Sequence, residues 1–252
     1  MLADLVRWDP GDVLVADLNS ENLAVLVDAD NAQASAVAKI LGEAARYGAT
    51  TIRRAYGDWT TPYLGLWKKV LHVHAIQPVQ QFRYTTGKNA TDSALIIDAM
   101  DILHGGKVDG FCLVSSDSDF TRLATRIREA GLAVYGFGEK KTPQSFVAAC
   151  DKFIYTEILG NEGGRPKSKP DAKLEAVLTA AVIAAAQEDG WAFLGAVGSH
   201  LNKNDPAFDS RNFGYRKLGD LVRAQAFLDV DERRPPVGSA PGQIYVRLTS
   251  AH

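Results

Sequence analysis

The sequence contains few of the features that mark special classes of protein. It has only two cysteines in 252 residues, Cys112 and Cys150, too few for a disulfide framework or a cluster of metal-binding thiolates. We expect both to be small core residues. No apolar run approaches the roughly 20 residues that a membrane-spanning helix needs. The formal net charge is −2, so any affinity for nucleic acid would come from local patches and not from bulk charge.

The first 21 residues also lack the pattern of a secretory leader. A leader begins with basic residues and continues into an apolar centre, whereas this segment has Arg7 among several acidic residues. We therefore expect a cytoplasmic protein that does not associate with membranes.

One stretch of the chain differs sharply in composition. Residues 160–171, GNEGGRPKSKPD, consist of Gly, Pro, Ser and charged residues together with one Asn, which is typical of a flexible linker. We therefore divide the chain into an N-terminal tail at residues 1–21, a first domain at 22–159, the linker, and a second domain at 172–252.

The first domain alternates predicted strands and helices. Residues 22–29, NLAVLVDA, form a continuous apolar run that is typical of a strand buried on both faces. The Ala-rich segment 31–48 follows with helical periodicity and ends in Gly48, which suits a helix cap. Alternation of this kind predicts an α/β fold with a parallel sheet between two layers of helices. Further strands are expected at 50–58, 71–79, 110–117, 132–138 and 153–159.

Acidic residues follow two of these strands. Asp28 and Asp30 end the first strand, and Asp117 and Asp119 end the strand at 110–117, so both pairs fall at the carboxyl edge of the sheet, where function gathers in such folds. Asp92 opens a long helix nearby in the expected topology. Carboxylates that converge repel one another unless a cation joins them, and oxygen ligands suit Mg²⁺ or Mn²⁺.

Each acidic pair also has a structural interpretation. Asp is common after strands because it forms turns and caps helices. We favour a capping role for Asp30, at the helix over residues 32–47, and a shared role for Asp119, which could also cap the helix that begins at Phe120.

Other polar residues are expected to be structural. Asp98 and Asp101 are predicted surface acids, and Asp58 is a strand-end acid that could form only a turn. His72 and His74 are predicted to project from one face of a strand in a packed or partner-facing role, because no further His or Cys accompanies them.

Four motifs carry a resemblance to a known family. LAVLVDADN, KNATDSALIIDAMDIL, LVSSDSDFTRLATRIREAGLAVYGFG and EKKTPQSFVAACDKFIY occur in this order over about residues 22–158. Together they resemble the NYN domain, a branch of the PIN-like nuclease superfamily with a Rossmann-like three-layer sandwich. The resemblance implies a ribonuclease that depends on Mg²⁺ or Mn²⁺ and hydrolyses phosphodiester bonds of RNA.

The same resemblance implies a set of site residues. Some relatives have two adjacent acids at the start of the long helix, where this chain has Thr91 before Asp92. By position, the implied catalytic residues are Asp28, Asn31, Asp92, Asp117 and Asp119. The four aspartates are the implied metal ligands, and Asn31 would orient a ligand or a phosphate oxygen.

Basic and aromatic residues close to these motifs are candidates for contact with RNA. Tyr63 and Trp67 could stack on bases, although at helical spacing they are more often core residues. The cations that could hold flanking phosphates are Lys88, Arg122, Lys140 and Lys141.

The second domain is predicted to be a winged helix. Three helical segments precede two strand-like segments, and FGYRKLGDLV resembles the OST-HTH or LOTUS domain, which implies a module that binds RNA or docks a protein. One interpretation makes Phe213, Tyr215 and Leu218 core residues, with the basic residues merely solvated. The other, with equal weight, is an RNA-facing patch of Arg211, Tyr215, Arg216 and Lys217.

Three classes of function are consistent with these patterns. The leading one is a metal-dependent endoribonuclease whose second domain binds RNA or a protein partner, with a homodimer left open. The alternative is a non-catalytic RNA-binding regulatory adaptor. A phosphatase-like hydrolase ranks low, because its Asp-x-Asp motif expects Thr or Val where this chain has Ala32.

Overall fold

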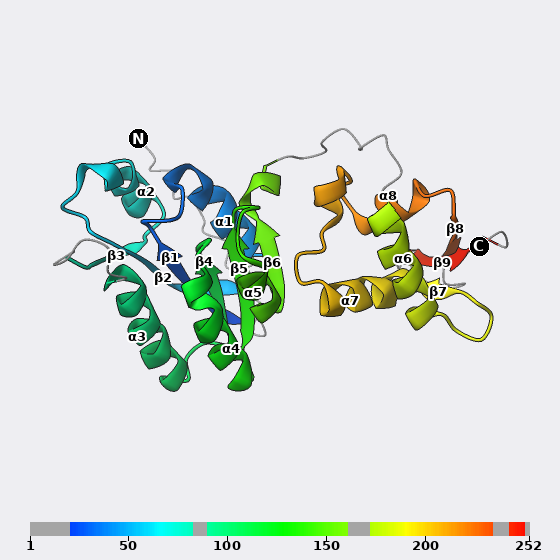
Figure 1. The fold of residues 1–252 in the computed structure, drawn as a ribbon, viewed down its shortest axis with the longest axis horizontal. Helices are drawn as coiled ribbons and strands as arrows, with labels where there is room; N and C mark the ends of the chain where they lie inside the picture. The colour runs from blue at the N-terminus through cyan, green and yellow to red at the C-terminus, as the bar shows by residue number, and fades with distance from the viewer. Residues whose placement is uncertain (1–20, 83–89, 161–171, 234–241, 250–252) are drawn as a thin grey trace, which may run out of the picture.

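A six-stranded parallel sheet forms the centre of the first domain (Figure 1). The computed structural model describes residues 21–82, 90–160, 172–233 and 242–249. The sheet has the order β3-β2-β1-β4-β5-β6, so the direction of strand addition reverses between β1 and β4. The strands are β1 (Asn22–Asp28), β2 (Ala49–Gly57), β3 (Gln77–Gln80), β4 (Gly110–Val114), β5 (Ala133–Gly138) and β6 (Lys152–Tyr155).

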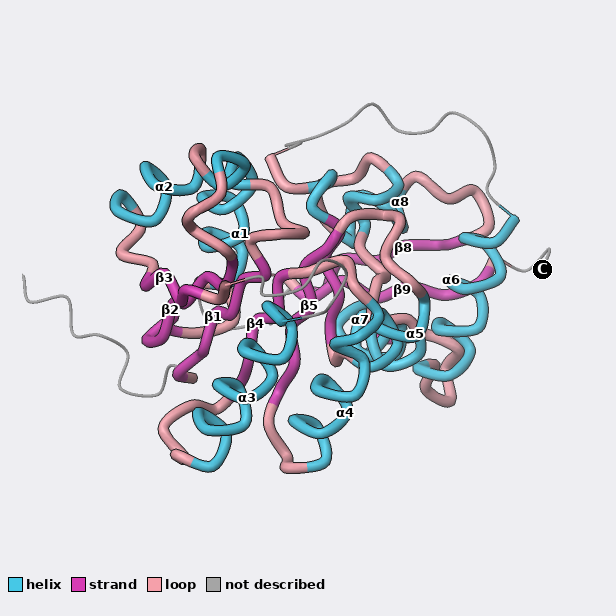
Figure 2. Tube along the Cα trace, turned by 60° about the vertical axis from the view of Figure 1, so that its left-hand side comes forward, coloured by secondary structure: helices cyan, strands magenta, loops and turns pink. Residues whose placement is uncertain are grey.

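Helices cover both faces of this sheet, as Figure 2 shows. Successive residues of β1 point to opposite faces, so Leu26 lies in one buried cluster and Val25 in the other. The first cluster packs beneath α3, α4 and α5, and the second beneath α1 and α2. This arrangement confirms the predicted α/β three-layer sandwich. The helices are α1 (Val37–Ala44), α2 (Trp67–Val73), α3 (Ala90–His104), α4 (Thr121–Glu129) and α5 (Gln144–Ala149).

Two local expectations are wrong. The strand expected at 71–79 is split, because Trp67 and Leu71 are one helical turn apart and both are buried, which makes α2 extend to Val73 and leaves only Gln77–Gln80 in β3. His72 therefore lies in α2 and His74 at its end, not on a strand.

Gly48 does not cap a helix either, because α1 ends at Ala44. It is needed for a close approach of two chain segments: a Cβ atom at this position would lie 2.3 Å from the carbonyl oxygen of Glu21.

The second domain has the predicted order of a winged helix. Its three-stranded sheet has the antiparallel order β7-β9-β8, and the short strand β7 was not expected. The third helical segment is interrupted because Gly214 adopts a positive φ of 86°. The elements are α6 (Ala172–Ala185), β7 (Ala192–Phe193), α7 (Leu194–Asn204), η6 (Ser210–Phe213), α8 (Leu218–Arg223), β8 (Leu228–Arg233) and β9 (Gln243–Leu248).

The second domain contacts the edge strand β6 of the first. The backbone N–H of Phe153 donates to the carbonyl oxygen of Pro206 at 2.8 Å. The Lys152 ammonium donates to Asn202 Oδ1 and to the carbonyl oxygen of Phe208, both at 2.7 Å. The first of these bonds occupies a backbone N–H that an edge strand would otherwise leave unpaired.

Three predicted segments lie wholly or almost wholly outside the described residues: the tail 1–21 except for Glu21, the linker 160–171 except for Gly160, and Lys88. None of the helices in the described parts of the chain combines the length and apolar character that crossing a lipid bilayer requires.

Candidate metal centre and nucleic-acid interface

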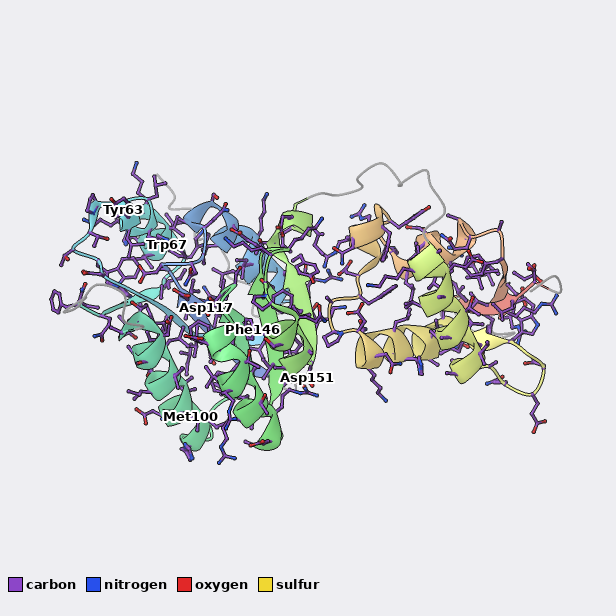
Figure 3. All side chains as sticks on the ribbon, in the orientation of Figure 1. Tyr63, Trp67, Met100, Asp117, Phe146 and Asp151 are labelled. Atoms are coloured by element: carbon purple, nitrogen blue, oxygen red, sulfur yellow. The ribbon has the colours of Figure 1, made fainter. Side chains whose placement is uncertain are left out.

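The predicted acids meet where the strand order reverses. Asp28 is the last residue of β1, Asp117 follows β4 at the start of η4 (Ser118–Phe120), and Asp92 lies in the first turn of α3. Figure 3 labels Asp117 at this edge of the sheet. The helices that follow β1 and β4 cover opposite faces of the sheet, so the carboxyl ends of these strands form the topological switch point at which such folds bind ligands. We call this edge of the sheet the crevice.

Three of these acids form a group that could hold a metal ion. Asp92, Asp117 and Asp119 each offer a carboxylate oxygen, and these oxygens all lie within 4.8 Å of one another. Burial raises the pKa of Asp92 to about 6, and the negative charges of Asp28, Asp117 and Asp119 add to the shift. A cation would relieve this repulsion, and a donor set made of oxygen alone fits Mg²⁺ or Mn²⁺.

Asp28 lies behind this group in a fully buried position. Its Oδ2 accepts hydrogen bonds from Asn31 Nδ2 at 2.7 Å and from Ser115 Oγ at 2.8 Å, and its Oδ1 accepts from the backbone N–H groups of Asp30 and Asn31. Burial raises the pKa of Asp28, and the bonds from Asn31 and Ser115 oppose the rise. Asn31 thus contacts Asp28 directly, and Ser115, which sequence reasoning missed, is a second partner.

Thr91 connects the helix that carries Asp92 to the loop after β1. Its buried hydroxyl donates to Asp30 Oδ2 at 2.9 Å. The capping role expected for Asp30 is wrong, because the next helical turn begins after Gln33 and Asp30 holds α3 instead.

Asp98 attaches the same helix to β2. The expectation that Asp98 is a plain surface acid is wrong, because Arg54 and Tyr56 both donate hydrogen bonds to its carboxylate. Its distance in sequence from both partners left no signal of this contact.

Two other acids are now placed. Asp117, not Asp119, caps the short helix η4, since its carboxylate accepts from the backbone N–H of Asp119 at 2.9 Å. Asp58 forms the expected turn, where it accepts from Thr60 Oγ1 at 2.6 Å and from Gln80 Nε2 at 2.9 Å.

Of the two candidate stacking rings, Trp67 is buried, as a core residue would be, whereas Tyr63 is 90% exposed (Figure 3). Tyr63 is therefore not part of the core.

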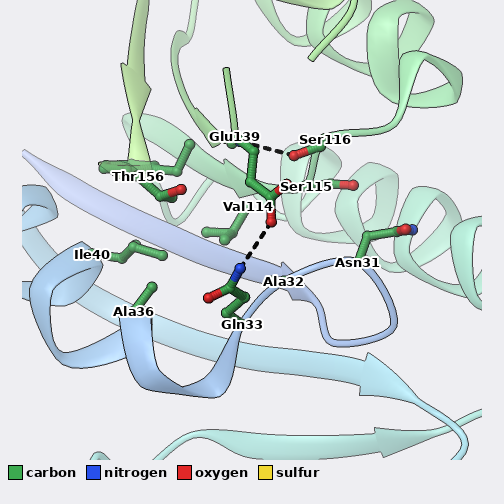
Figure 4. A pocket seen from close by; sticks show the side chains of 12 residues that line it. Asn31, Ala32, Gln33, Ala36, Ile40, Val114, Ser115, Ser116, Glu139 and Thr156 are labelled. Carbon is green, nitrogen blue, oxygen red and sulfur yellow. Dashed lines mark hydrogen bonds between the residues drawn. The ribbon is translucent and has the colours of Figure 1, made fainter. Parts of the chain in front are cut away.

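A narrow hollow adjoins the Asp28 site, as Figure 4 shows. Ile40 and Val114 belong to its apolar lining, and Ser115 links its wall to Asp28. Gln33 Nε2 donates to Glu139 Oε1 at 3.1 Å on its polar side. Its volume of about 20 Å³ suits one water molecule, so we assign it no substrate.

The cations proposed near the acids are exposed but differently placed. Arg122 lies in the first turn of α4, one turn beyond Asp119 in the chain. Lys141 Nζ pairs with Glu139 Oε2 at 2.8 Å, while Lys140 is exposed and its backbone N–H donates to Glu157.

Only part of the RNA-facing patch predicted on the second domain is exposed in the structure. Arg211 does not face solvent, because its guanidinium is held by both oxygens of Glu43, at 2.8 and 2.9 Å, and by Asp209 at 2.8 Å. Its side chain is only 18% exposed, which departs from the expected role in contacting RNA. Tyr215 is half-buried against the core of the second domain, as the core interpretation expects, whereas Arg216 and Lys217 are exposed.

Comparison with known families gives two matches, in the predicted order along the chain. The NYN domain matches residues 22–159, and the OST-HTH/LOTUS domain matches residues 166–239. Among curated proteins there is no match.

Three solved structures are similar to parts of the chain. A crystal structure of a protein of unknown function from Vibrio parahaemolyticus is 22% identical, with a TM-score of 0.45 over 54% of this chain and 93% of the other. An uncharacterized protein from Nitrosomonas europaea is 35% identical, with a TM-score of 0.29 over 36% and 90%. A protein from Chromobacterium violaceum is 42% identical, with a TM-score of 0.26 over 34% and 87%. At these TM-scores none of the three bears on function.

The two family matches fix the broad character of each domain. The first domain is of the PIN-like nuclease type, and the second is of the OST-HTH/LOTUS type. The first match covers more than half of the 252 residues, and the strand order, the grouped acids and the following winged helix agree with it. The chain belongs to the NYN domain family.

Proposed function

We propose that this protein is a metal-dependent endoribonuclease that hydrolyses phosphodiester bonds of RNA. The observation that carries the proposal is the group formed by Asp92, Asp117 and Asp119, whose carboxylate oxygens lie within 4.8 Å of one another at the crevice of an NYN domain. Mg²⁺ or Mn²⁺ is the proposed cofactor, because three carboxylates with room for water suit these ions.

The three grouped acids are the proposed ligands, and Asp28 has a supporting place. Asp28 is fully buried and accepts bonds from Asn31 and Ser115, so it adds negative charge behind the group while its own oxygens are occupied. A bound divalent ion would supply a water of lowered pKa and offset charge on the phosphate. Thr91, through Asp30, keeps Asp92 at the crevice.

The second domain is proposed to retain RNA. Its exposed cations Arg216 and Lys217 are placed to bind phosphates, and Arg122 and Lys140 could do so nearer the acids. Cytoplasmic location, protein partners of the second domain and a homodimer remain expectations from the sequence.

Cleavage of labelled single-stranded RNA tests the proposal. Purified protein is incubated with Mn²⁺, Mg²⁺ or EDTA, and we expect products only with a metal. Asp117→Asn should reduce the cleavage rate by at least about 100-fold, in line with the loss of an essential electrostatic group. Asp101→Asn is the matched control, because Asp101 is exposed on α3 and stands outside the group.

Asp117→Asn is a cleaner test than Asp28→Asn. An amide at position 28 would place a donor where Asn31 and Ser115 already donate, so that variant would disturb folding as well as charge. RNA that is bound but not cut under every metal condition would contradict the enzyme and favour the regulatory adaptor.

A further inference from the structure

An open cleft lies between the two domains, away from the grouped acids. The first domain contributes Tyr47 after α1, Tyr135 of β5 and Lys152 of β6, and the second contributes Arg216 and Lys217. The space within it is about 610 Å³, which is within the usual range for a ligand site. Figure 1 shows the two domains facing each other along β6.

The cleft is positively charged although the whole chain has a formal net charge of −2. Five basic and three acidic side chains line it. The acids already have partners: Arg211 binds Glu43 and Asp209, and Arg128 binds Asp151 at 2.9 Å.

Two cations in the cleft remain available for a ligand. Arg216 and Lys217 are exposed and have no ion-pair partner among the described residues. Arg46 is 64% exposed while it pairs with Glu43. Surplus positive charge of this kind, in a concave surface with low-dielectric walls, attracts polyanions.

An aromatic pair supplies a second feature of the cleft. The rings of Tyr47 and Tyr135 are stacked, with centroids 4.4 Å apart and an angle of 23° between their planes. Both rings are half-buried and line the cleft. Cations beside an aromatic surface are the combination that binds single-stranded nucleic acid, because the cations hold phosphates and the rings stack on bases.

We propose that this cleft is a binding site for single-stranded RNA that both domains build together. Arg216 and Lys217 hold the phosphates, and the tyrosine pair of the first domain receives a base. The inference rests on the proposed function only for the choice of RNA as the ligand, and it requires no cleavage. Arg211 acts indirectly, because its bonds to Glu43 and Asp209 hold the two walls of the cleft in place.

The position of the cleft sets a requirement on the length of the RNA. Lys152 begins β6, so the cleft lies toward the amino ends of the strands, while the grouped acids follow their carboxyl ends. Tyr135 and Lys152 are register partners, and Cys112 is the partner of Tyr135 on β4; the five residues from Cys112 to Asp117 span up to about 16 Å at a rise of about 3.3 Å per residue. An RNA of only two or three nucleotides is therefore too short to occupy both sites, whereas a longer strand can reach from one to the other.

Binding of a fluorescent 12-nucleotide oligouridine, measured by anisotropy in EDTA, tests the site without cleavage. The double variant Arg216→Glu/Lys217→Glu should bind at least about 10-fold more weakly, and the slope of log Kd against log salt should fall by about 1.4, as expected for two lost phosphate contacts on a single strand. The matched control is Lys68→Glu/Lys69→Glu on α2, which reverses two exposed charges outside the cleft. That control should change the Kd by less than about twofold.

The first-domain wall is tested separately. Tyr47→Leu should weaken binding by about fivefold or more, the low end of the loss of one base stack, and Tyr47→Phe should restore it because the ring remains. Unchanged affinity in Tyr47→Leu, equal loss in the Lys68/Lys69 control, or no RNA binding by the wild-type protein would overturn the inference. A protein that binds RNA in this way but never cleaves it would contradict the proposed nuclease and leave the cleft intact.

Discussion

Carboxylates lie close together at two places in this molecule, and the charges around them differ: they are negative at the crevice and positive at the domain junction. At the crevice, Asp92, Asp117 and Asp119 face one another, and burial together with their mutual repulsion raises the pKa of Asp92. At the domain junction, Glu43 and Asp209 are also removed from water, which tends to raise their pKa values. The hydrogen bonds and the positive charge of the Arg211 guanidinium outweigh that effect, and the pKa of both carboxyls is lowered.

This difference in charge distinguishes acids with a structural role, at the junction, from acids with a proposed functional role, at the crevice. A carboxylate whose charge is already balanced, as at the junction, stabilises one arrangement of the chain and leaves little attraction for a ligand. Carboxylates held together without a cation are poorly stable by themselves, and residues perturbed in this way cluster at functional sites. The acids at the crevice are therefore the proposed metal ligands, whereas the ion pairs of Arg211 join the two domains.

The largest effect on stability is expected from Arg211→Met. Glu43 has only 7% of its side chain exposed, so loss of Arg211 leaves a buried charge without its main partner. Removal of one member of such a group costs about 3–5 kcal/mol in the free energy of unfolding. Chemical denaturation measures this cost, and small-angle scattering should show the domains moving apart.

Arg223→Met is the control for that change. Arg223 pairs with Glu232 at 3.3 Å, but both side chains are nearly half exposed, so we expect a cost below about 1 kcal/mol. Equal costs for the two variants would contradict the view that the junction depends on Arg211.

Asp92→Asn should stabilise the metal-free protein, in contrast to the destabilising Arg211→Met. It removes one of several like charges at the crevice, so we expect a gain of about 1 kcal/mol in the free energy of unfolding, the size of a single charge pair at about 4 Å in water. Wild-type protein should in turn gain about 2.7 kcal/mol from Mn²⁺ at 100 times its Kd, and the variant should lose most of that gain.

Thermal unfolding with and without Mn²⁺ measures both effects of the Asp92 substitution. Asp101→Asn on the exposed side of α3 should leave both values unchanged. A wild-type protein whose unfolding temperature does not respond to Mn²⁺ or Mg²⁺ would contradict the metal centre, whatever its activity on RNA.

The crevice was largely predictable from sequence because its residues are tied to strand ends. Asp28 ends β1 and Asp117 follows β4, and a parallel sheet brings such positions to one edge. The sheet itself was also predictable, because the continuous apolar runs of β1 and β4 are typical of strands buried on both faces.

Contacts between segments that are far apart in the chain could not be predicted from the sequence. Arg211 looked like an exposed cation in a basic run, and its partner Glu43 lies 168 residues earlier. Thr91 and Asp98 carried no local signal of their contacts with Asp30 and Arg54. In each case the position of the side chain depends on how helices and domains pack, which a pattern within one segment does not contain.

The smallest of the expected effects is the pH dependence of the junction, and its sign distinguishes the two regions. Because the pKa values of Glu43 and Asp209 are lowered in the folded protein, their contribution to stability is complete above the unfolded values of 4.5 and 3.8 and is lost as the pH falls through the lowered values. In Arg211→Met, burial acts on Glu43 with less opposition, so protonation relieves a cost instead of removing a gain. The difference in unfolding midpoint between wild type and variant should therefore stay nearly constant from pH 7 to about pH 5 and shrink as the pH falls from about 5 to about 3. A difference that stays constant over this range would mean that the ion group at the junction contributes nothing to the docking of the two domains.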